Sequence, residues 1–183
     1  VARRLVTFQS QYDDCCNNHQ CWRGVLAAII GVISNDDSLF RFGIEVYLAQ
    51  MKGMNKDGSL PLEMKRDSMA IHYQSFAILP LVYIAEIAQR QGYDLYSVKF
   101  ASKDIHLAID FLVSALNDPS IVNKHTKSLQ AFSPDLYANL SFMEPYYRRF
   151  KKKELEKFLN NRRPFYNRRA GGPSTLYFYD PSP

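Results

Sequence analysis

The feature that most constrains this chain is a hydrophobic period of three to four residues, which recurs through most of its length. Apolar residues at this spacing lie along one side of an α-helix, so the period predicts helices that each bury one face. The helices are expected at residues 20–34, 39–53, 63–91 and 103–117, and two more begin near Ser133 and Lys152. A strand-like run, "STLYFY", occurs at residues 174–179 in the tail. We therefore predict an all-α fold.

Short polar residues mark where these helices begin, because their side chains accept hydrogen bonds from free backbone N–H groups. The expected N-caps are Asn17 or Asn18, Asp37 or Ser38, Ser102, and Ser133. Pro134 follows the last of these and suits the first turn of a helix. Pro80, by contrast, lies inside the segment 63–91 and is expected to kink or split it.

Short polar turns join the predicted helices, among them "NKDGSLP" at residues 55–61. Helices of similar length joined in this way form antiparallel hairpins. No linker divides the 183 residues, and no repeat is visible by identity. The sequence therefore predicts a single all-α domain over residues 1–183.

The net charge of +5 favours an acidic partner, and basic residues gather late, at 146–169. The charge alone does not distinguish nucleic acid, a membrane surface and acidic polysaccharide, and a solvated helix face explains such a run equally well. No nucleic-acid motif accompanies it, so we expect no nucleic-acid partner. No run of eighteen apolar residues occurs, so we expect no membrane span.

The stretch "CCNNHQCW" at residues 15–22 holds every cysteine of the chain. Cys15, Cys16, His19 and Cys21 are zinc-binding residue types, but structural zinc usually takes two ligand pairs separated by a loop. We therefore predict no metal. A disulfide between the neighbours Cys15 and Cys16 is strained, and the redox state of the three thiols stays open.

Asn18 and His19 bring an amide and an imidazole to the start of a helix, where the positive end of the helix dipole attracts anions. The pair could hold a carboxylate, or it could be an N-cap beside a core histidine. Trp22, one turn further on, is expected in the core.

A second group lies in "LPLEMKRDSMAIHYQSFAILPL", residues 60–81. Arg66 and Tyr73 are seven residues apart, which on one helix returns to nearly the same face, about 10 Å along the axis. A guanidinium beside a phenol stabilises the phenolate and makes it a usable base. The alternative is a surface arginine and a buried tyrosine.

These motifs, followed by "FMEPYYRRF" and "RRPFYNRRAGG", resemble in order and spacing the alginate lyase family, in which poly-mannuronate lyases act. The doublet cysteine of "CCNNH" resembles the Sphingomonas-type members. The likeness runs from about residue 15 to the tail. It implies an (α/α) toroid of antiparallel helix hairpins with a deep cleft, and cleavage of alginate by β-elimination without a metal or organic cofactor.

The resemblance also implies roles for four residues. Asn18 and Arg66, with help from His19, would neutralise the uronate carboxylate, and Tyr73 would take the C5 proton and return one to O4. His19 is an alternative base for guluronate.

Three further residues are expected at the substrate. His72, Arg168 and Arg169 would bind neighbouring sugars, although His72 could be a mere neighbour of Tyr73 and the two arginines part of a solvated tail.

Family members are longer than this chain, and they are periplasmic or secreted. We therefore expect the C-terminal part of a toroid, incomplete at its N-terminus, with residues 2–11 as the end of a helix. Its partners would be alginate and either its own N-terminal half or a second copy. Two rival functions remain: a lyase for another polyuronate, and a binder of anionic polysaccharide without catalysis.

Overall fold

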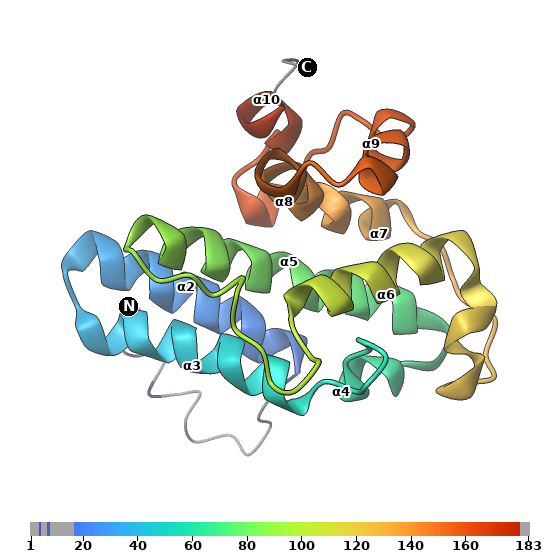
Figure 1. Cartoon of the computed structure of the whole chain (residues 1–183), viewed down its shortest axis with the longest axis horizontal. Helices are drawn as coiled ribbons and strands as arrows, with labels where there is room; N and C mark the ends of the chain where they lie inside the picture. The colour runs from blue at the N-terminus through green and yellow to red at the C-terminus, as the bar shows by residue number, and fades with distance from the viewer. Residues whose placement is uncertain (1–3, 5–6, 8–16, 180–183) are drawn as a thin grey trace.

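The structure is a computed structural model that describes Arg4, Thr7 and residues 17–179. In this part of the chain regular structure is helical, with two isolated bridges between extended residues, so the predicted all-α class is confirmed (Figure 1). The α-helices are α2 (Asn18–Ser34), α3 (Asp37–Gly53), α4 (Pro61–Met64), α5 (Ala70–Arg90), α6 (Ile105–Asn117), α7 (Pro134–Asn139), α8 (Met143–Phe150), α9 (Lys153–Asn160) and α10 (Ser174–Phe178). Short 3₁₀ turns form η1 (Asp67–Met69), η2 (Pro119–Lys124), η3 (Leu140–Phe142) and η4 (Arg168–Ala170). The predicted helix at residues 2–11 lies outside the described residues, apart from Arg4 and Thr7.

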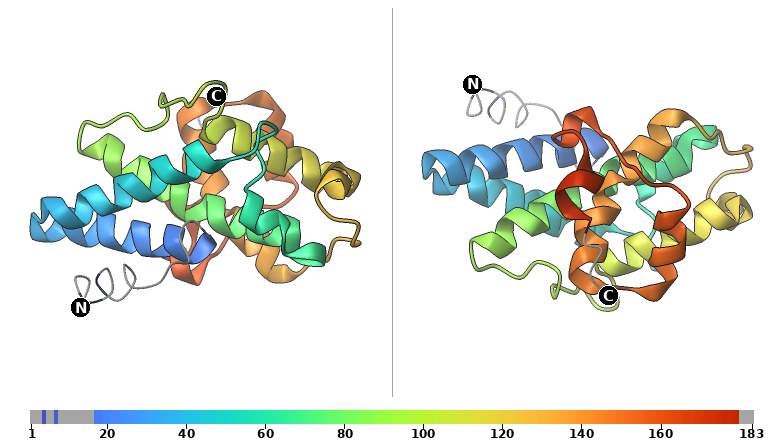
Figure 2. Two further views of the ribbon diagram at one scale, coloured as in Figure 1. Left: turned by 90° about the horizontal axis from the view of Figure 1, so that it is seen from below. Right: turned by 90° about the horizontal axis from the view of Figure 1, so that it is seen from above.

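The helices α2 and α3 form an antiparallel hairpin, as the turn composition predicts (Figures 1 and 2). They approach closely because glycines lie at the crossing. A Cβ atom added at Gly43 would lie 2.7 Å from both the Ala28 Cβ and the Gly24 carbonyl oxygen. This hairpin packs on α5 and fixes the start of α2 against the rest of the fold.

Helix α5 is the central element, and it contacts α2, α6 and α7. It runs from Ala70 to Arg90 through Pro80 without a break, so the predicted split at that proline is wrong. By length and composition alone, the segment Asp67–Arg90 is long and apolar enough to cross a membrane, although it contains no uninterrupted run of eighteen apolar residues. Its most apolar window is 67% buried in this fold, which is the position of a core helix.

The break in the predicted helix 63–91 falls instead at residues 65–69, between α4 and α5. Asp67 adopts a left-handed backbone with φ of 50°, which a continuous helix cannot contain. The helix therefore restarts at Ala70. This break decides how the two predicted site residues on either side of it meet.

Two predicted caps are wrong by one or two positions. Asp36 caps α3, in place of Asp37 or Ser38, and Asp104 caps α6 in place of Ser102. Asn17 caps α2, and Ser133 caps α7 with Pro134 in its first turn, as predicted. An aspartate accepts from the same backbone donors as a serine, so composition alone does not select between neighbouring candidates.

The segments from α7 to α10 lie over one side of α5 and α6 (Figures 1 and 2). A buried ion pair holds them together, because both Arg163 Nε and Nη2 donate to the Glu144 carboxylate at 2.9 Å. Thr175 donates to the same carboxylate at 2.6 Å and accepts from the Phe165 backbone N–H at 2.7 Å. Residues Ser174–Phe178 therefore form the short helix α10, and the predicted strand at 174–179 is wrong.

Candidate active site

A buried carboxylate joins the start of α2 to α4. Glu63 is 1% exposed, and its two oxygens accept from the Asn18 backbone N–H at 2.7 Å and from the Asn18 Nδ2 at 2.8 Å. Asn18 is itself fully buried. Two hydrogen bonds between residues 45 positions apart thus fix the amide to which the family resemblance assigns carboxylate binding.

Glu63 is the functional candidate that sequence reasoning missed. Burial raises the pKa of its carboxyl, while the hydrogen bonds from Asn18 and the charge of Arg66 act in the opposite direction. The Arg66 Nε lies 4.0 Å from the Glu63 carboxylate. The spacing of Glu63 three residues before Arg66 could have pointed to this glutamate, but the same spacing is typical of an exposed ion pair on a helix surface.

The Asn18 amide keeps binding capacity beyond Glu63. Its Nδ2 carries two hydrogens and the described contacts use one of them, while its Oδ1 is buried without a hydrogen-bond partner among the described residues. A buried polar atom without a partner is unusual in a folded protein. The amide thus has one donor and one acceptor unused, but Asn18 is 0% exposed, so a ligand reaches them only when a neighbouring group moves aside.

Arg66 and Tyr73 meet as predicted, but not on one helix. The Arg66 Cζ lies 4.9 Å from the centre of the Tyr73 ring. Arg66 precedes η1 and Tyr73 lies in the first turns of α5, so the bend at Asp67 directs the arginine onto the ring. The Tyr73 side chain is half-buried and the Arg66 side chain is 40% exposed, which leaves both open to a ligand.

His19 is exposed at the start of α2, which excludes the alternative of a core histidine. Its backbone N–H donates to the Asn17 cap at 3.0 Å, and its imidazole is open to solvent. Its neighbour Cys21 is a buried free thiol, and burial raises the pKa of that thiol. Cys15 and Cys16 lie outside the described residues.

Aromatic rings surround Tyr73. His72 lies edge-on to it with ring centres 5.2 Å apart, and Phe76 is 6.3 Å from both rings. Trp22 packs on Phe76 at 5.1 Å and against the core, as predicted. The Arg169 Cζ lies 5.5 Å from the Phe76 ring centre. The ring cluster therefore brings the tail arginine to the site.

His72 is half-buried, and burial and the nearby Arg169 charge lower its pKa, against an opposing effect of Asp135. A neutral imidazole suits contact with a sugar hydroxyl. Arg168 is exposed, and among the described residues no contact brings it to Tyr73 or His72. The structure thus brings Arg169 to the site and leaves Arg168 apart from it.

No group of three or more His, Cys, Asp or Glu residues in the described part of the chain is arranged to hold a metal ion. The site is instead a phenol beside a guanidinium, with a buried amide, an exposed imidazole and aromatic rings around them. Such a set can bind a carboxylate and transfer a proton next to it.

The arrangement defines a helical domain with a tyrosine–arginine site, and comparison with known proteins identifies its family. The profile of the family described as "Alginate lyase" matches residues 1–122, and the chain belongs to that family. A polysaccharide lyase of Stenotrophomonas maltophilia is 34% identical over 164 residues, covering 87% of this chain and 46% of the relative. An alginate lyase of Pseudomonas syringae is 31% identical over 172 residues, covering 92% and 44%.

Solved structures agree. Alginate lyase A1-III from Sphingomonas species A1 superposes with a TM-score of 0.89 at 42% identity, covering 99% of this chain and 52% of that one. A tyrosine-to-phenylalanine variant of A1-III, complexed with a tetrasaccharide, superposes with a TM-score of 0.90 at 41% identity. The match covers 100% of this chain and 53% of that one. The likeness confirms the predicted (α/α) toroid class. The chain spans about half the length of the relatives it matches.

Proposed function

We propose that this chain acts as a polysaccharide lyase that cleaves alginate by β-elimination, with poly-mannuronate as its preferred substrate. The contact that carries the proposal is that of the Arg66 guanidinium with the Tyr73 ring, at 4.9 Å. Glu63 links it to Asn18, through contacts of 4.0 Å to Arg66 and 2.8 Å to the amide. Membership of the alginate lyase family supports the reaction class.

The difficulty of the reaction lies at C5 of the uronate, whose proton is only weakly acidic while the adjacent carboxylate is anionic. In the proposed reaction, Arg66, the free N–H of Asn18 and His19 bind that carboxylate and stabilise the charge that develops on it. Donors held in place before the reaction cost no reorganisation in the transition state. Glu63 holds the Asn18 amide in place in this way, through the two hydrogen bonds that it accepts from Asn18.

Tyr73 acts as base and then as acid. Its phenolate takes the C5 proton, the electron pair of that bond forms the C4–C5 double bond, and the C4–O4 bond breaks. The departing O4 takes the proton back from Tyr73, so no net proton is consumed. In mannuronate the C5 proton and O4 lie on the same side of the ring, so one phenol can perform both transfers.

The exposed side of the site is suited to the flanking sugars. His72 and Phe76 offer ring faces, and Arg169 offers a guanidinium that can bind the carboxylate of a neighbouring unit in a bidentate manner. Arg168 is the less favoured of the two tail arginines, because no contact brings it to these rings.

The test is the ultraviolet absorbance of the product. Elimination leaves a double bond conjugated to the carboxylate, which absorbs, whereas hydrolysis does not. We expect a rise when the chain is mixed with poly-mannuronate, and a fall in rate of about 10²–10⁴-fold for Tyr73→Phe. The matched control is Tyr93→Phe, since Tyr93 is 59% exposed and lies on the loop after α5.

Each other outcome contradicts a particular part of the proposal. A Tyr73→Phe rate equal to that of the parent would remove Tyr73 from the reaction. A product from polyglucuronate but not from poly-mannuronate would change the substrate. Binding of alginate by a folded chain without any rise in absorbance would make it a binding protein.

A further inference from the structure

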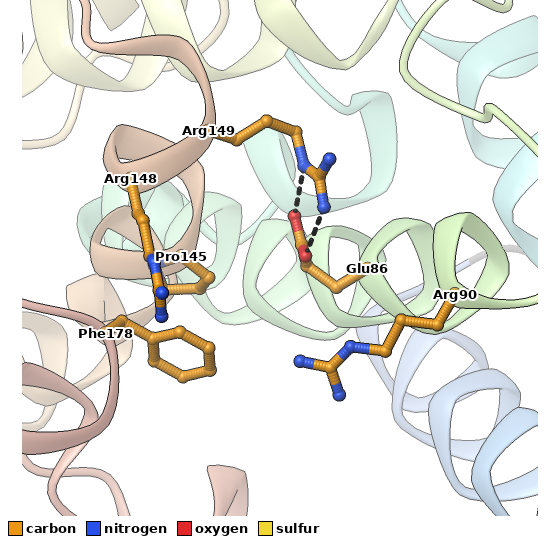
Figure 3. A pocket seen from close by; sticks show the side chains of 6 residues that line it. All are labelled: Glu86, Arg90, Pro145, Arg148, Arg149 and Phe178. Carbon is orange, nitrogen blue, oxygen red and sulfur yellow. Dashed lines mark hydrogen bonds and ion pairs between the residues drawn. The ribbon is translucent and has the colours of Figure 1, made fainter.

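A pocket of about 430 Å³ lies between α5, α8 and α10 (Figure 3). It is lined by Glu86, Arg90, Pro145, Arg148, Arg149 and Phe178. Its volume falls within the range of about 300–1,000 Å³ that is usual for small-molecule sites. None of its lining residues has a role in the proposed reaction.

One of the three arginines is neutralised within the protein. Arg149 donates from Nε and Nη2 to the Glu86 carboxylate, at 2.8 and 2.7 Å. The same guanidinium lies 5.4 Å from the Tyr96 ring centre, which holds it further in place. This bidentate pair forms a fixed wall of the pocket and contributes no net charge.

The other two arginines keep their charge. Arg90 and Arg148 are both exposed, and in the described part of the chain neither side chain forms an ion pair or a hydrogen bond. They extend toward the same opening from α5 and α8, with the Phe178 ring and Pro145 near Arg148 (Figure 3). The pocket thus combines two free guanidinium groups with an apolar surface.

The pocket is separate from the candidate active site. Glu86 and Tyr73 are thirteen residues apart on the continuous helix α5, which places them about 20 Å apart along its axis. At about 100° per residue they also point to different sides of the helix.

We propose that this pocket is a second binding site for anionic sugar, in which Arg90 and Arg148 bind uronate carboxylates and the Phe178 ring packs against a sugar face. Guanidinium groups bind carboxylates in bidentate geometry, and an aromatic ring provides the apolar contact that a sugar ring needs. The choice of uronate rests on the proposed function. An inorganic anion would use the arginines but would gain nothing from Phe178 and Pro145.

The site can be tested by amide NMR titration of the ¹⁵N-labelled chain, in the Tyr73→Phe background so that no turnover occurs. The ligands are trimannuronate, a neutral mannose trisaccharide and inorganic phosphate. We expect trimannuronate to shift amides of α8, α10 and the end of α5, separately from those around Asn18 and Arg66. The double variant Arg90→Gln, Arg148→Gln should raise the trimannuronate Kd measured from the pocket amides about 3- to 10-fold. The Kd measured from the amides around Asn18 and Arg66 should not change.

The matched control is Arg41→Gln, which removes an exposed arginine of α3 outside both sites and should change neither Kd. Circular dichroism verifies that the variants are folded. Phe178→Ala should raise the Kd of trimannuronate at the pocket but leave the Kd of phosphate unchanged.

The outcomes separate this proposal from the proposed function. Absence of shifts in the pocket, an unchanged Kd in the double variant, or equal binding of phosphate and trimannuronate would overturn the sugar site. Shifts in the pocket from a chain that produces no unsaturated product would retain the second site and contradict the lyase.

Discussion

At the scale of single residues, the sequence indicates the groups that could face substrate but not the group that holds them. Asn18, His19, Arg66 and Tyr73 were assigned through the resemblance of their motifs to the alginate lyase family, because the residues alone left an N-cap and a buried tyrosine as open alternatives. Glu63 belongs to the same motif, yet a glutamate is ordinarily exposed. Its burial arises from Asn18, 45 residues away, and so it depends on tertiary contacts that local pattern does not encode.

The pH dependence of Glu63 follows from its burial. Its pKa is raised in the folded state, so the folded chain holds this proton more tightly than the unfolded chain. The contribution to stability is then fully present below the unfolded pKa of about 4.3, and it is lost as pH rises through the folded value. Glu63→Gln has no such proton. We expect its free energy of unfolding, relative to the parent, to increase between about pH 4 and pH 7, as measured by urea denaturation.

The comparison variant is Glu63→Ala, which leaves the Asn18 amide unsupported. It should be less stable than Glu63→Gln by about 1–3 kcal/mol at every pH, since neither variant carries the titrating proton. If Glu63 positions Asn18, the elimination rate should fall strongly in Glu63→Ala and be partly restored in Glu63→Gln, whose single oxygen can accept one of the two hydrogen bonds that Asn18 donates. A parent and a Gln variant whose stability difference does not change with pH would contradict the raised pKa.

At the scale of elements, periodicity predicted where helices lie better than where they end. Helix α5 continues through Pro80, because the surrounding packing compensates for the lost backbone hydrogen bond. The bend at Asp67 was not foreseen, since an aspartate with positive φ leaves no mark in the apolar period. That bend matters most for the site, because it brings Arg66 onto Tyr73. The contact between Arg66 and Tyr73 was predicted correctly, but from their spacing on one continuous helix, and the helix is interrupted between them.

The turn between α3 and α4 offers a test at this scale. Asp57 accepts from Ser59 Oγ at 2.7 Å and contacts Lys124 Nζ at 2.7 Å and His125 Nε2 at 2.8 Å, which ties the turn to η2. Burial alone would raise the pKa of Asp57, but the hydrogen bonds from Lys124, Ser59 and His125 outweigh it and hold that pKa well below its usual value. Stability from this group is therefore present above the unfolded pKa of about 3.9 and is lost as pH falls through the folded value.

We expect Asp57→Asn to lose about 1–2 kcal/mol of unfolding free energy at neutral pH, and the difference from the parent to shrink in acid. Thermal unfolding followed by circular dichroism at several pH values measures it. Asp37→Asn, an exposed aspartate in the first turn of α3, is the control and should change stability little. A loss for Asp57→Asn that is as large in acid as at neutral pH would contradict the lowered pKa.

At the scale of the whole molecule, the helical class could be derived from periodicity, but the toroid could not. The period indicates which face of each helix is buried, but it does not indicate which other helix packs against that face. The arrangement of the helices as a toroid was expected only from the family resemblance. The positions of the charged residues in space could not be predicted from the sequence either. The late basic run divides in space, with Arg169 near the Tyr73 cluster and Arg148 in the pocket beside α10. Basic residues of this run thus lie at two separate places.

This distribution predicts a strong dependence of catalysis on salt. Positive charge at both places attracts an anionic polymer over a distance that salt shortens. We expect kcat/KM on poly-mannuronate to fall about tenfold between about 0.05 M and about 0.5 M NaCl. The change should lie mainly in KM, because salt weakens the long-range attraction of the polymer equally in the ground state and the transition state, whereas Arg66 contacts the carboxylate directly in the partly buried site. Sucrose at equal osmolarity is the control and should leave kcat/KM unchanged. Trimannuronate, which carries fewer charges, should show a smaller salt effect, and an equal effect on both substrates would place the salt dependence in the chemical step.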